Sequence, residues 1–299
     1  MAGPDADPAA PLRRSLDSGR VHSAYLISGA GDAPRRAALA FARGIVCTGE
    51  APRPCERCLG CRRSAPREEP ALDGTGKKGP LYRHVGDHPD LLFVARGEDD
   101  TRVRIGQIRA LQSALRLRPS EGGARAAVIA DAEWLNQEAQ NALLRLLEEP
   151  PPRTTLVLVA ASAAGLLATL RSRCQRVAFR AAEGEGWLGP EAPEAARGLA
   201  ERLERVGAAS LPELLDWAEG LRGARGEAAA AAELLLETAT AWLHRRVAEH
   251  ARSGGRDFAR ALAAFAAVRD ARRALVQRNA NPQMVAERAL FALHDAAAR

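Results

Sequence analysis

The sequence predicts an α/β protein with a parallel sheet in residues 1–180, followed by an all-helical region in residues 181–299. Short apolar runs alternate with segments of helical periodicity as far as residue 180, which is the pattern of strands joined by crossover helices. After residue 180 the strand signals stop, and helical segments are separated by glycine-containing breaks at 219–226 and 253–255. With 299 residues, 46% hydrophobic and 27% charged, the chain is expected to be globular with more than one domain. The boundary is expected near residue 180, in the segment AAEGEGWLGP.

Each element is predicted from its periodicity and from the residues that end it. Apolar runs predict strands at 22–28, 90–95, 126–130, 155–160 and 176–179. Apolar residues at i, i+3 and i+4 predict helices at 12–18, 34–45, 105–118, 134–149 and 166–174. Pro34 suits the first position of a helix, whereas Pro150 stops the helix that precedes it. The polar segment 62–88 is expected to be a surface loop, residues 235–243 an apolar helix face, and Asn281 the start of the last helix.

The charge balance permits a nucleic-acid partner without requiring one. Lys and Arg number 43 and Asp and Glu 37, which gives a formal net charge of +6. Only two of these cations are lysines, Lys77 and Lys78, so arginine supplies 43 − 2 = 41. No apolar run approaches the ~20 residues that a membrane span needs. The first eleven residues lack the apolar core of a signal peptide, so a cytoplasmic protein with no membrane partner is expected.

Four cysteines lie within fifteen residues and predict a metal site. Their spacing is Cys47-x7-Cys55-x2-Cys58-x2-Cys61. Zn²⁺ prefers four ligands in a tetrahedron, and a CxxC pair lets two thiolates reach one ion from a tight turn. No histidine lies between them, and four thiolates leave no open position, so a structural rather than a catalytic Zn²⁺ is expected in a module at 47–61. The alternative is a set of free buried thiols or redox cysteines.

The segment 29–36, GAGDAPRR, follows a predicted strand and precedes a predicted helix, as a phosphate-binding loop does. Pro34 replaces the second glycine of GxxxxGK[ST] and removes an N–H that would face the phosphates. Arg35 replaces the lysine with a larger, forked cation, and Arg36 replaces the hydroxyl that would bind Mg²⁺. The loop is therefore predicted to be degenerate, at the positions Gly29, Gly31, Pro34, Arg35 and Arg36.

The acidic half of a nucleotide site is also incomplete. Asp131 follows the strand at 126–130, where an acid would handle Mg²⁺. Ala132 occupies the next position, where a catalytic glutamate would be expected. Glu133 is one residue further, and in an extended chain that shift turns its side chain to the other face. The backbone elements of both halves of an ATPase site are thus predicted to be present, the loop at 29–36 and the end of the strand at 126–130. Each half is predicted to lack side chains needed for hydrolysis.

Taken together, these segments resemble the delta-prime family of bacterial DNA polymerase III clamp-loader subunits, within the AAA+ superfamily. The residues that carry the resemblance are HSAYLISGAG, the cysteine cluster, His88-Pro89-Asp90, NALLRLLEEPPPRT (141–154), LLATLRSRC (166–174) and Asn281-Pro282-Gln283. They cover residues 20–180 well and the C-terminal helices loosely. The resemblance implies an AAA+ (RecA-like) domain with a zinc-module insertion, then a helical region in which a lid is abbreviated or absent and a collar follows.

The resemblance also implies a function. Such a subunit sits in a ring with gamma/tau motor subunits and a delta subunit, does not hydrolyse ATP, and meets the sliding clamp and primed DNA through the complex. Arg173 of the Ser-Arg-Cys motif is then an arginine finger offered in trans to ATP on a neighbouring motor subunit. Two alternatives stay open: an active gamma/tau-like ATPase in which Arg35 serves for lysine, and a ring-independent zinc-containing DNA-binding protein.

Overall fold

The computed structural model describes residues 7–29, 31–97, 100, 102–120, 123–179, 194–251, 256–278 and 280–298. The chain divides into two compact units, Met1–Arg180 and Ala181–Arg299. The predicted boundary segment AAEGEGWLGP and the predicted break at 253–255 lie outside the described residues. The first unit carries a parallel sheet and the second is helical, so the predicted fold class is confirmed.

One sheet organises the first unit, with the strand order β2-β3-β4-β5-β1-β6. Neighbouring strands are parallel except for the antiparallel pair β2–β3. Ser28 at the end of β1 pairs with Ala160 of β5 and with Ala178 of β6, so three carboxyl ends meet beside residue 29. The strands are β1 Ala24–Ser28, β2 Arg83–His84, β3 Leu91–Val94, β4 Arg125–Ile129, β5 Thr154–Ala160 and β6 Gln175–Ala178.

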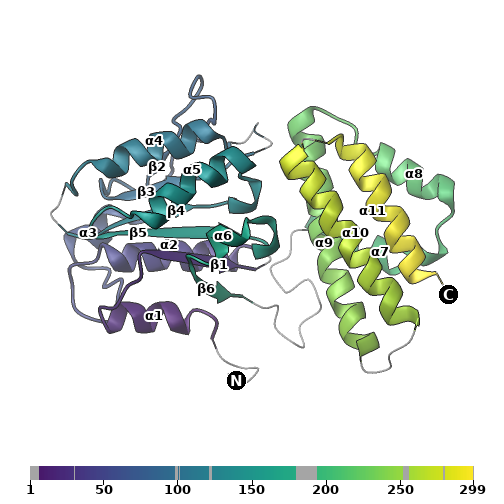
Figure 1. The fold of residues 1–299 in the computed structure, drawn as a ribbon, viewed down its shortest axis with the longest axis horizontal. Helices are drawn as coiled ribbons and strands as arrows, with labels where there is room; N and C mark the ends of the chain where they lie inside the picture. The colour runs from purple at the N-terminus through teal and green to yellow at the C-terminus, as the bar shows by residue number, and fades with distance from the viewer. Residues whose placement is uncertain are drawn as a thin grey trace. The chain divides into compact units, whose positions relative to one another are not determined.

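Helices cover both faces of this sheet (Figure 1). On one face lie α1 (Ala10–Asp17) and α2 (Ala33–Ile45), and on the other α4 (Ile105–Arg116) and α5 (Gln137–Glu148). Successive strand residues point to opposite faces, so every second residue of β1, β3, β4 and β5 joins the core under α1 and α2. All seven residues of β5 are buried, as a strand covered on both faces requires. Each large apolar side chain buried here contributes about 1.5–3 kcal/mol of transfer free energy.

Two local predictions differ from the structure in their details. The helix predicted at 134–149 is confirmed as α5, but it begins at Gln137, because the side chain of Asn136 caps it by accepting the N–H of Ala139 (2.9 Å). Trp134 belongs instead to a short 3₁₀ turn, Ala132–Trp134. The loop predicted at 62–88 contains β2, whose two residues pair with Leu92 and Phe93. A two-residue polar strand leaves no apolar periodicity from which it could be predicted.

Helices α7 (Glu194–Glu204), α8 (Leu211–Glu219), α9 (Arg225–Ala251), α10 (Arg256–Arg278) and α11 (Pro282–Ala297) form the second unit. The apolar face predicted at 235–243 is buried between them. Arg272 of α10 pairs with Glu233 and Glu237 of α9. Asn281 Oδ1 accepts the N–H of Gln283 (2.9 Å), so the predicted start of the last helix is confirmed. Among the described residues, no helix combines the length and apolarity needed to cross a bilayer.

Candidate functional site

The four clustered cysteines converge at one point beside the end of α2. Their Sγ atoms all lie within 4.8 Å of one another; Cys47 and Cys58 are 3.8 Å apart, and Cys55 and Cys61 are 4.0 Å apart. Cys58 also caps the short helix α3 (Leu59–Arg63), because its Sγ accepts the N–H of Cys61 (3.4 Å). These separations suit the edges of a tetrahedron with metal–sulfur bonds of about 2.3 Å.

The electrostatics of the cluster also fit a thiolate-bound cation. Burial acts to raise the pKa of Cys58, but backbone and side-chain hydrogen bonds from Cys61 and Thr48 outweigh it and lower the pKa to about 5. Backbone N–H groups of Arg57 and Cys58 likewise lower the pKa of Cys55. Burial raises the pKa of Cys61 to about 12, so an adjacent cation is needed to hold all four sulfurs as thiolates. The donor set therefore fits Zn²⁺.

The loop after β1 packs closely against the residue that follows β6. The N–H of Gly29 is engaged by the carbonyl of Ala160 (3.1 Å). A Cβ at residue 29 would lie 2.5 Å from the carbonyl oxygen of Phe179 and 3.2 Å from Cγ of Pro34. Phe179 is fixed there because its own N–H donates to the carbonyl of Ser28 (2.7 Å). Pro34 is buried at the start of α2 and offers no N–H, while Gly31 holds a φ of +73° and Ala30 lies outside the described residues. At Pro34 the loop therefore lacks one of the N–H groups with which a phosphate-binding loop holds its ligand.

The two arginines that follow Pro34 have their own contacts. The guanidinium of Arg35 lies 5.0 Å from the ring centroid of Phe93 on β3, and that of Arg83 lies 4.7 Å from the same ring. Arg35 therefore lies against the sheet beside α2. Arg36 is more than half exposed and lies 3.8 Å from the carboxylate of Asp32, one helical turn before it.

The acidic residues after β4 serve the ends of neighbouring strands. Asp131, in the left-handed region with φ 52°, accepts the backbone N–H of Arg96 through Oδ2 (3.1 Å). Ala132 is fully buried. Glu133 is 5% exposed, and its Oε1 accepts the backbone N–H of Ala161 beyond β5 (2.9 Å). Its carboxylate thus supports the sheet.

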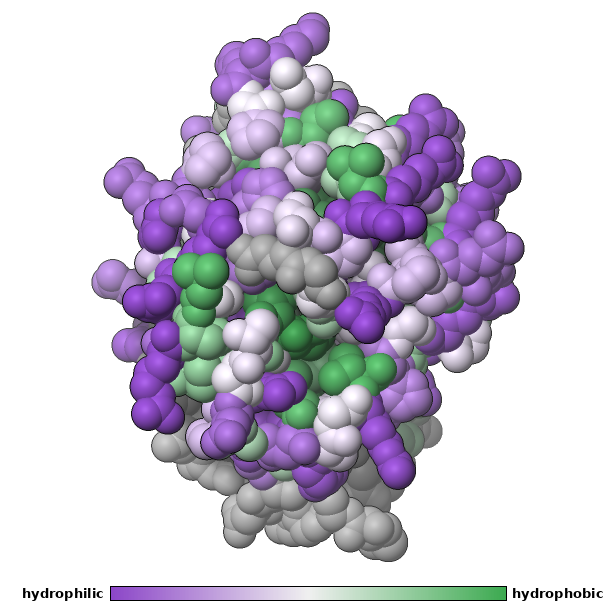
Figure 2. Space-filling view, turned by 90° about the vertical axis from the view of Figure 1, so that its left-hand side faces the viewer, coloured by the Kyte–Doolittle hydropathy of each residue, from purple (hydrophilic) through white to green (hydrophobic). Residues whose placement is uncertain are grey.

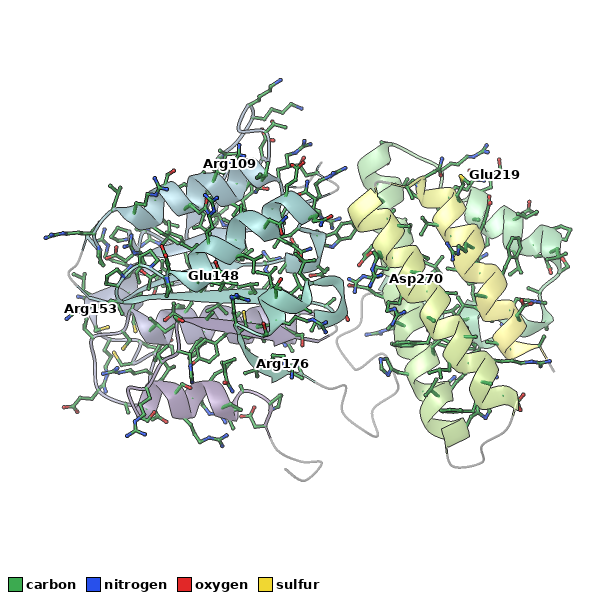
Figure 3. The ribbon with its side chains drawn as sticks, in the orientation of Figure 1. Arg109, Glu148, Arg153, Arg176, Glu219 and Asp270 are labelled. Atoms are coloured by element: carbon green, nitrogen blue, oxygen red, sulfur yellow. The ribbon has the colours of Figure 1, made fainter. Side chains whose placement is uncertain are left out.

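Arg173 lies on the surface after the short helix α6 (Ala168–Arg171). Its Nη1 donates to the carbonyl of Thr169 (2.9 Å), and its Nη2 lies 2.8 Å from Oε1 of Glu148 at the end of α5. The side chains of Arg173 and Glu148 are 38% and 49% exposed; Figure 3 labels Glu148. Counting partners among the described residues, two of its five guanidinium N–H groups are used, which leaves three for an external anion. Burial raises the pKa of the neighbouring Cys174 to about 11, so this cysteine is a neutral thiol.

Two site residues could not be predicted from the sequence. Phe179 was expected only as the end of a strand, and no local signal shows that it covers Gly29. Glu148 was expected only as part of the LEEPP motif, 25 residues before Arg173. Sequence periodicity relates residues within a few positions of each other, so it cannot predict this ion pair. Knowledge that β6 pairs in parallel with β1 would have indicated the contact between Phe179 and Gly29.

A separate cavity of about 470 Å³ lies at the opposite edge of the sheet, beside the amino-terminal ends of β1 and β5. Pro150, Pro151, Pro152, Leu16 and Ile45 contribute apolar lining, and Arg53 and Arg153 are its arginines. Figure 2 shows this hollowed face, with apolar groups gathered around the depression and hydrophilic groups around them. It is remote from residues 29–36 along the strands, so it is not the nucleotide position.

The sheet order, the loop after β1 and the acid after β4 define a phosphate-loop domain of the AAA+ class whose loop departs from the usual pattern at Pro34, Arg35 and Arg36. The chain belongs to the family described as DNA polymerase III, delta subunit, which matches residues 6–183. The resemblance stated from the motifs is therefore confirmed.

Individual relatives agree with this assignment. The DNA polymerase III subunit delta′ of Bacillus subtilis is 30% identical over 170 residues, covering 56% of this chain and 45% of that protein. The Escherichia coli subunit delta′ is 32% identical over 168 residues, covering 55% and 44%. A DNA polymerase III subunit gamma/tau of Mycobacterium tuberculosis is 29% identical over 173 residues, covering 57% and 26%. The matches to the delta′ subunits thus span a little under half of the length of those relatives.

Proposed function

We propose that this chain is a non-hydrolysing, delta-prime-type subunit of the DNA polymerase III clamp loader. The observation that carries the proposal is the loop after β1, in which Pro34 offers no N–H and Phe179 packs against Gly29. The guanidinium of Arg35 lies against Phe93, and the buried Ala132 stands where a catalytic glutamate would be expected, so a group needed for hydrolysis is missing from the site. A chain with this site has no ATPase activity of its own and serves as a component of the holoenzyme.

The catalytic contribution proposed for the chain is Arg173, acting in trans. A guanidinium placed on the transferring phosphoryl group of ATP bound by a neighbouring motor subunit stabilises the charge that develops there. Arg173 is exposed, keeps three N–H donors unused, and is oriented by the carbonyl of Thr169. Its planar fork matches phosphate oxygens better than a lysine would.

The remaining parts have supporting roles in this proposal. The partners are gamma/tau motor subunits and a delta subunit, with the sliding clamp and primed DNA engaged by the assembled complex in the cytoplasm. Zn²⁺ at Cys47, Cys55, Cys58 and Cys61 is structural. The helices from Glu194 onward form the collar of the ring, and a lid is short or absent.

One experiment tests the proposal directly. The purified full chain is assayed for ATP hydrolysis and for ATP binding, alone and after assembly with gamma/tau, delta, clamp and primed DNA. We expect no turnover by the chain alone and a clamp- and DNA-dependent turnover that requires the chain in the assembly. Turnover by the chain alone at the rate of a motor subunit would overturn the proposal.

The second candidate is an active gamma/tau-like motor. The gamma/tau relatives and the retained cation at Arg35 favour it. It predicts ATP binding by the isolated chain, and Arg35→Ala would abolish that binding. The same assay therefore separates the two candidates.

A further inference from the structure

A loop between Asp73 and Pro80 is folded around a single carboxylate. Oδ2 of Asp73 accepts the backbone N–H groups of Lys77 (2.8 Å) and Lys78 (2.7 Å), and Oδ1 accepts that of Thr75 (2.8 Å). The N–H of Asp73 donates to the carbonyl of Pro80 (3.1 Å), which closes the loop. The loop thus has an internal hydrogen-bond network, in contrast to the unstructured surface loop predicted from its composition.

The base of the loop is fastened to the start of α4 by buried polar groups. Asp100, 6% exposed, accepts the N–H of Gly74 through Oδ2 (2.7 Å) and binds Arg104 Nε through Oδ1 (2.8 Å). Gln107, fully buried, donates to the carbonyl of Leu81 (3.1 Å). Buried hydrogen bonds of this kind fix a segment, because leaving either group unpaired costs about 1–3 kcal/mol.

The tip of this loop carries every lysine in the sequence. Lys77 and Lys78 are exposed, and within the part of the chain that the structure describes neither side chain forms an ion pair. The loop projects beyond α4 in Figure 1. α4 contains no acidic residue, and its exposed arginines are Arg109, labelled in Figure 3, and Arg116. The loop exposes two lysines and α4 exposes two arginines, and α4 contributes no carboxylate that would neutralise them.

We propose that the loop at residues 73–80 binds the phosphate backbone of DNA through Lys77 and Lys78. The tip residues are Thr75, Gly76, Lys77, Lys78 and Gly79, so no apolar or aromatic side chain is available for a protein hot spot or for base stacking. Ammonium groups act as point charges toward phosphate. A fixed loop loses little conformational entropy on binding. The interaction is with the backbone and is independent of base sequence.

This interaction adds direct DNA binding to the proposed function, in which DNA is met through the complex, and it requires nothing of Arg173. Its failure would leave the clamp-loader proposal intact. Conversely, an ATPase-active chain would overturn that proposal without affecting this one.

The first test uses the full chain with a fluorescent 20-base-pair duplex at about 50–200 mM KCl, read by anisotropy. Each phosphate that a lysine neutralises adds about 0.9 to the steepness with which log K falls against log[KCl], so K77A/K78A is expected to reduce that steepness by about 1.8. K77R/K78R keeps both charges and is expected to retain the slope. The control R14A/R20A removes two exposed cations on α1 and beyond it, and both alanine double variants reduce the net charge from +6 to 6 − 2 = +4.

A slope unchanged in K77A/K78A, an equal fall in R14A/R20A, or no binding by the wild-type chain at 50 mM KCl would each overturn the proposal. Binding of fluorescent poly-glutamate by the chain, without any binding of the duplex, would assign the loop to an acidic protein instead and would overturn the proposal as well. Circular-dichroism melting of all variants shows that they are folded.

The second test uses the scarcity of lysine. Acetylation by an amine-reactive ester, read by mass spectrometry, modifies only Lys77, Lys78 and the α-amino group. We expect DNA to slow acetylation of both lysines several-fold at low salt, with protection abolished at high salt and no change at the α-amino group. Equal acetylation with and without DNA, under conditions where the duplex is bound, would contradict the assignment.

Discussion

The guanidinium of Arg173 is joined to the carboxylate of Glu148, with 2.8 Å between Nη2 and Oε1, across 25 residues of sequence. Both side chains are partly exposed, and such pairs contribute about 0.2–1 kcal/mol. An external phosphate that binds the guanidinium of Arg173 through Nη2 must displace the carboxylate of Glu148. The pair therefore links the LEEPP and Ser-Arg-Cys motifs by an interaction that involves Arg173, the proposed finger, while contributing little to stability.

Glu148→Gln is expected to favour delivery of Arg173 to a phosphate. Removing an ion pair of this strength changes an equilibrium by about 1.4- to 5-fold, so the ATP concentration for half-maximal turnover of a reconstituted loader should fall by that factor. Steady-state kinetics measure it. Glu149→Gln, at the next and exposed residue, is the matched control. A rise in that ATP concentration, or an equal effect of the control, would refute the expectation.

Arg173→Ala is expected to leave the chain folded and to impair the loader. Loss of an arginine finger costs about 10³-fold or more at the site it serves, so single-turnover hydrolysis at the affected motor site should fall by that factor. Arg173→Lys should recover only part of it, because lysine lacks the planar fork. Arg176→Ala removes an equal charge from the exposed side of β6 and should have no effect. Unchanged turnover in Arg173→Ala would remove the finger assignment.

Removal of zinc is expected to destabilise the first unit. A ligand that binds only the native state adds about 4 kcal/mol of unfolding free energy at 1,000 times its Kd. Cys58→Ser should lose the metal and that stabilisation, whereas Cys174→Ser should keep both. Elemental analysis and thermal melting with and without a chelator measure this. A purified wild-type chain that carries no metal would exclude the zinc assignment.

Glu133→Ala is expected to destabilise the sheet, because it leaves the N–H of Ala161 without its carboxylate acceptor. Such a loss costs about 1–3 kcal/mol of unfolding free energy. Glu133→Gln keeps an acceptor oxygen and should cost less, and Glu68→Ala, at an exposed position, should change stability little. Urea denaturation of the three variants gives the comparison. Equal stabilities would mean that Glu133 does not support β5.

The order of the loop at 73–80 is expected to survive mild acid. Backbone N–H groups of Lys78, Thr75 and Lys77 and the hydroxyl of Thr75 hold the pKa of Asp73 well below its usual range. A depressed native pKa contributes stability that is present above the unfolded pKa of about 3.9 and is lost only as the pH falls through the native value. Amide exchange at Lys77 and Lys78 should therefore stay protected, after correction for intrinsic rates, between pH 7 and about 4. Asp73→Ala should lose this protection at every pH.

Most of the scaffold could be predicted because its signals are local. The buried runs at 24–27 and 156–160 carry the apolar signal of strands, and the cysteine spacing is itself a ligand pattern. The contacts that decide what the loop after β1 can do are not local. Phe179 against Gly29, Glu133 on Ala161 and Glu148 on Arg173 each join segments at least 25 residues apart. Such contacts depend on strand order and register, which one sequence does not specify.

The contacts around the loop after β1 affect how readily substitutions could restore a nucleotide site there. Arg35 stacks on Phe93, Glu133 supports β5, and Gly29 accommodates Phe179, so each of these positions contributes to packing or hydrogen bonding in the domain. Restoring one motor-type residue, such as lysine at position 35, would remove a stacking interaction without recreating a nucleotide cradle. Recovery would need several simultaneous replacements, each unfavourable by itself. The absence of ATPase activity that we propose would therefore be difficult to reverse by single substitutions.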